Sequence, residues 1–496
     1  MHLHMHLLVS ILSALFLQLV SSIAVDSSNS TYLFTQPVDH FDRTGNNNRQ
    51  WSQRYMINST FYRSGGPIFM ITPGESPLLS YYTDSVHLAS LAQSTGGMVV
   101  AIEHRFYGQS NPLPDLSGES LAYLTIDNVL EDFASFIRAI KTNPSSIFPM
   151  AVPKDTKVVF GGGSYAGNIA AWMRAKYPDL VEGAWASSAV VYGRLENYQY
   201  DQSYGHHLNV LGCGGCFAQA VKDLDDIFLS GDVQKIAEAQ QKFGIPGLTT
   251  ADSAALIAAL VSSAANDPIT QTGDPMDYAV CSYFADNKTN DSQSTSCLDR
   301  YAAATNGAIE RLGLLPNMML IMGNSSLGLD YTAVDQVSRT WYYQMCTWFG
   351  GWQVPPLKST GLTAYRSELL NLDYWQGSCR KRFGPQIPVP VDVDAYNKKW
   401  FEILRGATNI YYTAGELEIW RDSTVATTQG NLLQSHRGSR IVVISGANHG
   451  QDMRLESELD LDSVKDARRI GNRLVSRWLG NKSRSRNNSV RSTSCA

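Results

Sequence analysis

The chain has 496 residues, of which 44% are hydrophobic and 17% are charged, and its formal net charge is −5. This composition is ordinary for a globular protein, and the length suffices for one catalytic domain that carries a sizeable insertion. The negative charge, with no Lys/Arg-rich run in the body of the chain, gives no electrostatic reason to expect nucleic acid as a partner.

Residues 1–24 predict a secretory signal peptide. The apolar stretch from Leu7 to Val20 is short for a membrane span, and Ser22-Ile23-Ala24 has the small-x-small pattern of a cleavage site. Histidines stand where the usual basic residues are expected, so a metal-binding tract is the alternative, but cleavage would remove it. We expect a secreted (extracellular) protein, or one in a vacuolar or lysosomal-type compartment, with no membrane span.

Secretion explains the sequons and the cysteines. N-x-S/T sequons predict glycosylation at Asn29, Asn58, Asn287, Asn290, Asn324, Asn481 and Asn487. Of the seven cysteines, Cys495 lies in the tail, and the other six predict disulfides whose pairing the spacing leaves open. The C-x-x-C pair Cys213 and Cys216 resembles a redox or zinc motif, but the chain has no second such pair, so structural bridges are favoured.

Strand-like and helix-like segments alternate in residues 25–194, which predicts an α/β fold with a mostly parallel sheet covered on both faces. An amphipathic helix is expected over Ile126–Ile140. The expected strands are Trp51–Ile57, Pro67–Thr72, Met98–His104 and Val181–Ala186.

The most informative motif is G-G-S-Y-A-G at residues 162–167, between the apolar run Lys157–Phe160 and a helical stretch over Asn168–Tyr177. A strand that ends in glycines and enters a helix through a serine is typical of the nucleophile elbow of an α/β-hydrolase. Small neighbours keep the Ser164 hydroxyl exposed on this tight turn. The usual motif has glycine where this chain has Ala166, and a glycine-rich turn without chemistry is the alternative.

Residues 195–375 are mostly helix-like and predict a cap inserted into the sheet domain. Amphipathic helices are expected at Phe217–Phe228, Val233–Phe243 and Ala254–Ala264. The sheet domain resumes over residues 376–479, with strands at Asn409–Thr413 and Arg440–Ser445 and a helix at Ser463–Trp478. Residues 480–496, rich in Ser, Asn and Arg, predict a disordered tail.

A serine nucleophile needs a base and an orienting carboxylate, which follow it in the order acid, then histidine, in an α/β-hydrolase. His449 follows the late strand within a loop of small residues and is the expected base, with a surface histidine as the alternative. Glu416, Glu418 and Asp422 compete for the role of acid in the loop after the preceding strand, and spacing does not rank them.

An oxyanion hole needs two backbone N–H groups aimed at the developing negative charge. One is expected from Tyr165, the residue after the nucleophile, and the other from Gly74 in the loop over residues 72–76. An ordinary Pro-Gly turn is the alternative for that loop.

Four sequence blocks, at residues 103–108, 162–165, 415–420 and 449–452, resemble the signatures of the prolyl carboxypeptidase and dipeptidyl peptidase II family of serine peptidases. This family also contains secreted fungal acid prolyl endoproteases. The blocks match in order from about Phe34 to Trp478. The resemblance implies an α/β-hydrolase fold with a disulfide-linked, mostly helical cap. It also implies an enzyme that cleaves peptides, often on the carboxyl side of proline.

The resemblance supports Ser164 as nucleophile and His449 as base. The acid loop of the family usually reads N-G-E-x-D-P-W, which places its aspartate at Glu418, so Glu418 is the expected acid and Asp422 the reserve. The resemblance also implies that Trp420 lines the pocket for the residue before the scissile bond. It further implies a Cys346–Cys379 bridge and, less directly, Cys216–Cys281.

The expected activity is that of a secreted exopeptidase acting on peptides or proteins through an acyl-enzyme, without metal or cofactor. A lipase or carboxylesterase of the same fold is the enzymatic alternative, but the usual HGGG-type motif is absent. A catalytically silent binding protein is the other alternative. Residues 103–105 are expected to support the site from below. Four tryptophans could form a wall for a proline ring or the core of the cap: Trp341, Trp348, Trp352 and Trp375.

Overall fold

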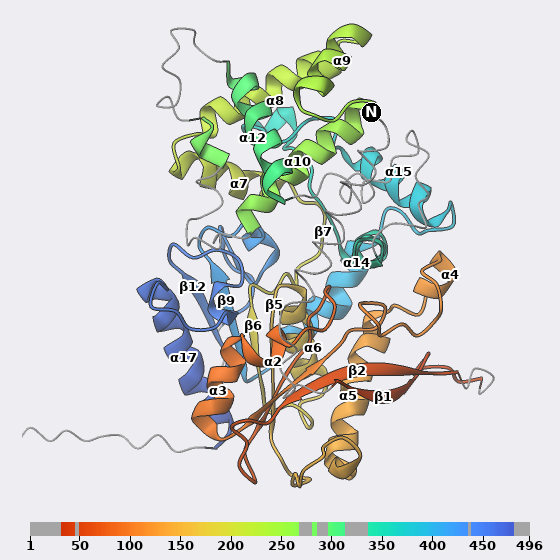
Figure 1. The fold of residues 1–496 in the computed structure, drawn as a ribbon, viewed down its shortest axis with the longest axis vertical. Helices are drawn as coiled ribbons and strands as arrows, with labels where there is room; N and C mark the ends of the chain where they lie inside the picture. Colours follow the sequence, from red (N-terminus) through yellow and green to blue (C-terminus); the bar gives the residue numbers. More distant parts are fainter. Residues whose placement is uncertain are drawn as a thin grey trace, which may run out of the picture.

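The computed structural model describes residues 31–44, 49–266, 280–284, 296–312, 336–434 and 438–480. An 8-stranded sheet with the order β1-β2-β4-β3-β5-β6-β9-β12 forms its centre (Figure 1). β2 pairs antiparallel with β1 and β4, whereas the other neighbouring strands pair in parallel. The strands are β1 (Thr31–Pro37), β2 (Gln50–Asn58), β3 (Ile68–Ile71), β4 (Met98–Ile102), β5 (Val158–Gly163), β6 (Gly183–Ser187), β9 (Ile410–Gly415) and β12 (Arg440–Ile444).

Helices cover both faces of the sheet. Because side chains alternate along a strand, Ile68 and Met70 of β3 pack with α5 (Ile126–Thr142) and α6 (Tyr165–Lys176). Phe69 and Ile71 pack on the opposite side. That side is covered by α3 (His87–Thr95) and α17 (Asp462–Trp478). The prediction of a mostly parallel sheet covered on both faces is confirmed.

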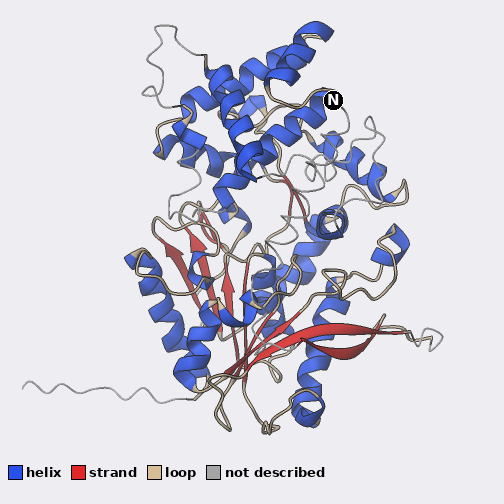
Figure 2. Ribbon diagram, in the orientation of Figure 1, coloured by secondary structure: helices blue, strands red, loops and turns tan. Residues whose placement is uncertain are grey.

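A layer of helices lies over the edge toward which the arrowheads of the parallel strands point (Figure 2). Its helices enclose a second hydrophobic cluster, separate from those of the sheet. They are α7 (Tyr198–Val210), α8 (Gly214–Phe228), α9 (Val233–Lys242), α10 (Thr250–Asn266) and α12 (Cys297–Leu312). This layer is the expected mostly helical cap.

Several shorter elements connect the cap to the sheet domain. The strands β7 (Arg194–Glu196) and β8 (Gly350–Trp352) pair in parallel where the chain enters and leaves the cap. Further α-helices in the described ranges are α2 (Tyr81–Asp84), α4 (Gly118–Leu121), α14 (Gln336–Gln344), α15 (Leu372–Phe383) and α16 (Val393–Tyr396). A two-stranded ribbon of β10 (Ala426–Thr427) and β11 (Gly430–Asn431) follows the acid loop.

Three disulfides cross-link the part of the chain that the structure describes. The Cys346–Cys379 bridge is confirmed, but the Cys216–Cys281 pairing is wrong, because Cys281 bonds Cys213 and Cys216 bonds Cys297. Cys213 and Cys216 lie one helical turn apart at the start of α8, so both approach the same neighbouring elements. Only packing decides which thiol meets which partner. The α/β-hydrolase fold with a disulfide-linked helical cap is therefore confirmed.

The sequence predicted most of these elements to within a few residues. The strand β1 was not predicted, and α6 begins three residues before the expected Asn168, because the turn itself is Ser164. Residues 1–24, Cys495 and every sequon except Asn58 lie outside the described residues. The Asn58 amide nitrogen donates to Asp84 Oδ1 at 2.7 Å. No helix in the described ranges combines the length and hydropathy needed to cross a membrane.

A buried ion pair joins the segment after β4 to α5. The Arg105 guanidinium donates to both oxygens of Asp132 at 2.6 and 2.7 Å. Burial alone would raise the pKa of Asp132, but the charge and hydrogen bonds of Arg105 outweigh burial and hold this pKa below its usual value. The pair therefore stabilises the fold at neutral pH, and this contribution is lost as the pH falls through the lowered pKa.

We expect Asp132→Ala to lower the free energy of unfolding by about 3–5 kcal/mol, since it leaves a buried guanidinium without its counter-charge. Urea denaturation at neutral pH measures this change. Asp226→Ala is the matched control, because it breaks the exposed contact of Asp226 with Lys222 at 2.6 Å and should not move the urea midpoint measurably. Equal shifts in the two variants would contradict the prediction.

Candidate active site

Ser164 occupies a strained turn between β5 and α6. Its φ of 55° and ψ of −130° lie outside the regions that most side chains adopt. The Ser164 amide donates to Ser187 O of the neighbouring strand at 2.9 Å, which fixes the turn to the sheet. A Cβ on Gly162 would lie 2.5 Å from the Ala166 backbone, so the tight turn requires glycine there. The turn therefore has the form expected of a nucleophile elbow.

The departure at Ala166 fits the local packing. Ala166 is buried at the first turn of α6, beside the loop that follows β3. A Cβ added to Gly74 would lie 3.3 Å from both the methyl carbon and the amide nitrogen of Ala166. Because Gly74 has no side chain, the alanine methyl is accommodated where the usual motif has glycine.

His449 lies in the loop after β12, and a neighbouring carboxylate anchors that loop. Asp452 accepts hydrogen bonds from Trp185 Nε1 at 2.8 Å, Ser187 Oγ at 2.5 Å and Thr413 Oγ1 at 2.8 Å. These three donors belong to β6 and β9. Asp452 is thereby fully engaged in holding the loop against the sheet, and His449 remains partly exposed.

Of the three competing carboxylates, Glu418 alone contacts the imidazole. Its Oε2 lies 3.2 Å from His449 Nδ1, and the Glu418 side chain is fully buried. Asp422 instead accepts from the amide and hydroxyl of Thr428, each at 2.9 Å. Glu416 accepts from Ser445 Oγ and Gly446 N at 2.7 and 2.8 Å. The structure thus brings Glu418 to the position that the resemblance implied.

Backbone contacts hold the loops of Glu418 and His449 together. Glu416 N donates to Ile444 O and Leu417 N donates to Ala447 O, both at 3.0 Å. A Cβ on Gly415 would lie 2.5 Å from the carbonyl oxygens of Ala447 and Asn448. Glycine at this position therefore permits the close approach that places an acid beside the histidine.

Ser164 and His449 line one cavity of about 320 Å³. They come from the carboxyl ends of β5 and β12, and parallel strands direct the residues of these ends to one edge of the sheet. The Ser164 hydroxyl and the His449 imidazole face the cavity but do not hydrogen-bond to each other. This arrangement is compatible with catalysis, because catalytic hydrogen bonds are often long before substrate binds. Most of the other lining side chains are apolar or aromatic: Val190, Tyr192, Trp341, Met345, Phe349 and Trp420.

The expected oxyanion donors lie close to Ser164. Tyr165 is the first residue of α6, so its N–H has no partner within the helix. Gly74 packs against the same helix end, and its amide makes a long bond of 3.3 Å to Thr72 Oγ1. A substrate oxyanion at this position would have to replace that weak bond.

Residues 103–105 support the site as expected. Glu103 accepts from Leu78 N at 2.7 Å and so holds the loop that contains Gly74. His104 Nε2 lies 2.9 Å from the Tyr165 hydroxyl, and burial lowers the pKa of His104 to about 4. A neutral His104 therefore accepts from Tyr165 below the elbow and takes no part in the triad.

The aromatic residues divide between pocket and core. Trp341 and Trp420 line the cavity, and Trp420 also makes an edge contact with Tyr200 of α7, with ring centroids 4.7 Å apart. Trp348 and Trp352 belong to the main hydrophobic core. Trp375 stacks on Trp352 with ring centroids 5.3 Å apart. Only Trp341 of the four tryptophans considered from the sequence thus faces substrate space.

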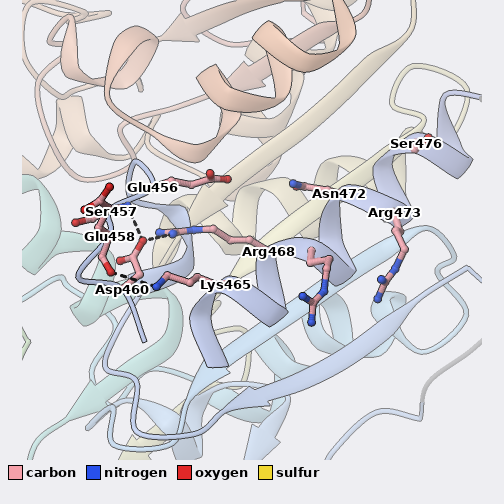
Figure 3. Close-up of a pocket in the computed structure, with 10 residues that line it drawn as sticks. Glu456, Ser457, Glu458, Asp460, Lys465, Arg468, Asn472, Arg473 and Ser476 are labelled. Carbon is pink, nitrogen blue, oxygen red and sulfur yellow. Dashed lines mark hydrogen bonds and ion pairs between the residues drawn. The ribbon is translucent and has the colours of Figure 1, made fainter. Parts of the chain in front are cut away.

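A larger groove of about 750 Å³ runs along α17 (Figure 3), and neither Ser164 nor His449 is among the residues that line it. Charged side chains line it, and several of them bind one another or the nearby backbone. Arg468 pairs with Asp460, and Lys465 Nζ donates to Glu458 O at 3.2 Å. These contacts attach α17 to the preceding loop, and the groove holds none of the groups expected to react.

Sequence reasoning missed two charged residues of the cavity, Glu75 and Arg194. Glu75 follows the expected oxyanion donor directly, so its position in the loop was a usable signal. Burial raises the pKa of Glu75, whereas the nearby His449 lowers it by less. Arg194 begins β7, at the entry to the cap, where no sequence motif marks it.

Comparison with known proteins relates the sequence to serine peptidases. The family described as serine carboxypeptidase S28 matches residues 36–470. A thymus-specific serine protease of Mus musculus is 28% identical over 472 residues, covering 90% of this chain and 86% of the mouse protein. A probable extracellular serine carboxypeptidase of Arthroderma benhamiae is 26% identical over 489 residues, covering 89% of this chain and 67% of the fungal protein. A solved proline iminopeptidase of Mycobacterium smegmatis aligns with a TM-score of 0.35 and 12% identity, covering 91% of this chain and 100% of that chain.

Proposed function

Since the chain belongs to the serine carboxypeptidase S28 family and is a serine-type peptidase, we propose that it is a secreted exopeptidase that cleaves after proline through Ser164, His449 and Glu418. The observation that carries this proposal is the contact of the buried Glu418 with Nδ1 of His449 at 3.2 Å, because His449 lines the same cavity as Ser164.

The mechanism is acyl transfer to water. Ser164 Oγ attacks the peptide carbonyl while His449 Nε2 accepts its proton, and Glu418 holds the Nδ1–H tautomer and stabilises the imidazolium. The N–H groups of Tyr165 and Gly74 stabilise the tetrahedral oxyanion. His449 then protonates the leaving amine. Water next attacks the acyl-enzyme while His449 accepts its proton, and His449 returns a proton to Ser164 Oγ as the acid product leaves.

The preference for proline rests on the shape and chemistry of the cavity. Trp341, Phe349 and Trp420 present aromatic surface near Ser164, which suits a rigid apolar ring. Secretion is supported by the disulfides, which persist in oxidising compartments, and by the relative described as extracellular.

A matched substrate panel tests this proposal. We expect the purified protein to hydrolyse blocked peptides with proline before the scissile bond about 10- to 100-fold faster in kcat/KM than the same peptides with alanine. Short-chain esters serve as the comparison for an esterase. Equal rates for proline and alanine would remove the proline preference, and turnover of esters alone would overturn the peptidase mechanism.

A further inference from the structure

Ser188, the residue after β6, binds the loop that carries His449. Its Oγ accepts the backbone N–H of Gly450, the chain neighbour of His449, at 2.8 Å. Only 1% of the surface of Ser188 is exposed, and Ser188 is not among the residues that line the cavity of Ser164. Its hydroxyl therefore contacts the backbone beside the expected base without lying in the space for substrate.

The loop of His449 has to reach across the sheet to meet Ser164. In the strand order, β6 and β9 lie between β5, which ends at Ser164, and β12, which precedes His449. Neighbouring strands lie about 4.8 Å apart, so the loop after β12 spans about 14 Å over the ends of β9 and β6. The imidazole is placed accurately only if the far end of this loop is anchored.

Two consecutive residues at the end of β6 bind both sides of this gap. Ser187 O accepts from the Ser164 amide at 2.9 Å, and Ser188 Oγ accepts from the Gly450 amide. The Ser188 amide donates to Thr413 O of β9 at 2.8 Å, which fixes the serine to the sheet. The nucleophile turn and the loop of the base are therefore held by the same strand end.

The backbone of Ser188 is strained. Its φ of 47° lies in the left-handed region, which residues with a Cβ rarely adopt. Glycine would adopt this φ without strain, so the backbone conformation alone does not explain a serine here. Strain of this kind persists where the surrounding structure holds it and is frequent at functional sites. The hydrogen bond that the Ser188 hydroxyl accepts is what the side chain adds at this position.

We infer that Ser188 is a positioning residue for His449, whose hydroxyl sets the place of the imidazole relative to Ser164 Oγ. This inference rests on the proposed peptidase function and adds to it a residue that acts through the base without touching substrate. Asp452 attaches the same loop to β6 and β9 independently. Loss of the Ser188 hydroxyl should therefore displace the imidazole while the loop stays folded.

The test compares Ser188→Ala with wild type in the hydrolysis of a blocked peptide that has proline before the scissile bond. We expect kcat to fall about 10- to 100-fold, because a misplacement of about 1 Å at a catalytic group can cost about two orders of magnitude. KM should stay within about twofold of wild type, since no group in the cavity is changed. The rate of fluorophosphonate labelling should fall as kcat does, because it needs the same base.

Ser253→Ala is the matched control. Ser253 of α10 is also buried, its Oγ accepts from Gln240 Nε2 at 2.9 Å, and it does not line the cavity. Both alanine variants lose one buried acceptor, so the thermal unfolding midpoint should fall in each, but only Ser188→Ala should lose kcat. Ser188→Gly removes the hydroxyl and the strain together. It should be as slow as Ser188→Ala, and it replaces that variant if alanine does not fold.

A double variant tests whether Ser188 acts through the base. In a His449→Ala background no imidazole remains to be placed, so Ser188→Ala should not lower the residual labelling rate further. A residue that merely stabilises the nucleophile turn would lower this rate in either background. The two losses should therefore fail to multiply.

Each outcome bears on one claim. If wild type neither hydrolyses the peptide nor takes the label, the proposed function fails and the inference fails with it. If wild type is active, unchanged kcat in Ser188→Ala, a rise in KM alone or a fast Ser188→Gly variant overturns the inference and leaves the proposed function intact. Losses that multiply in the double variant overturn it as well.

Discussion

Replacement of Ser164 by alanine should lower kcat for peptide substrates by about five to six orders of magnitude, because no other group can form the acyl-enzyme. The fold should be retained, since Ser164 holds the turn through its backbone amide, which alanine keeps. Purified wild type and variant are compared in single-turnover peptide hydrolysis and in covalent labelling with a fluorophosphonate.

Ser423→Ala is the control for the labelling experiment. Ser423 lines the same cavity, but its hydroxyl accepts from Asn197 at 3.3 Å and has no contact with His449. We expect the label on wild type and on Ser423→Ala and no label on Ser164→Ala. A well-folded wild type that resists the reagent would argue for a silent binding protein in place of an enzyme.

The second large effect is expected at the acid. Glu418→Gln should lower kcat by about four orders of magnitude, because a neutral amide neither stabilises the imidazolium nor enforces the Nδ1–H tautomer. Stopped-flow or steady-state kinetics measures the change, and the thermal unfolding midpoint reports whether the fold is retained. Labelling by a fluorophosphonate should slow in parallel, since it depends on the same activated serine.

Asp422→Asn is the matched comparison for the acid assignment. Its carboxylate binds Thr428, and its backbone carbonyl binds Arg194, so the side-chain change should affect kcat far less than Glu418→Gln. Glu418→Asp should retain part of the activity. Aspartate keeps the negative charge, but its side chain is one methylene shorter and so holds the carboxylate farther from His449. A large loss in Asp422→Asn together with an active Glu418→Gln would transfer the role of acid to Asp422.

Local patterns in the sequence determined much of the fold and the order of the proposed catalytic groups. Buried parallel strands appear in the sequence as continuous apolar runs, and the amphipathic helices of the cap show apolar residues at helical spacing. Both patterns can therefore be recognised in short stretches of sequence. The motif around Ser164 predicts its turn because only a few small residues permit that backbone. His449 was predicted as the base because it lies in a loop of small residues that follows a clear strand.

The tertiary structure decided the choices that depend on contacts between distant segments. The spacing of residues left three carboxylates as candidates for the acid of the triad. Only the pairing of β9 with β12 brings one of them, Glu418, to His449. The sequence allows either Cys213 or Cys216 to pair with Cys281. Only the packing of the helices determines that Cys213 bonds Cys281 and Cys216 bonds another cysteine.

The same distinction separates the pocket from its surroundings. The sequence gives no signal that distinguishes Trp341 from Trp352, yet Trp341 lines the cavity and Trp352 is buried in the core. Glu75 and Arg194 lie more than a hundred positions apart, and only the folded chain places both in one cavity. Local periodicity and turn chemistry act between near neighbours in the chain, whereas a binding site is defined by the packing of segments that the sequence keeps apart.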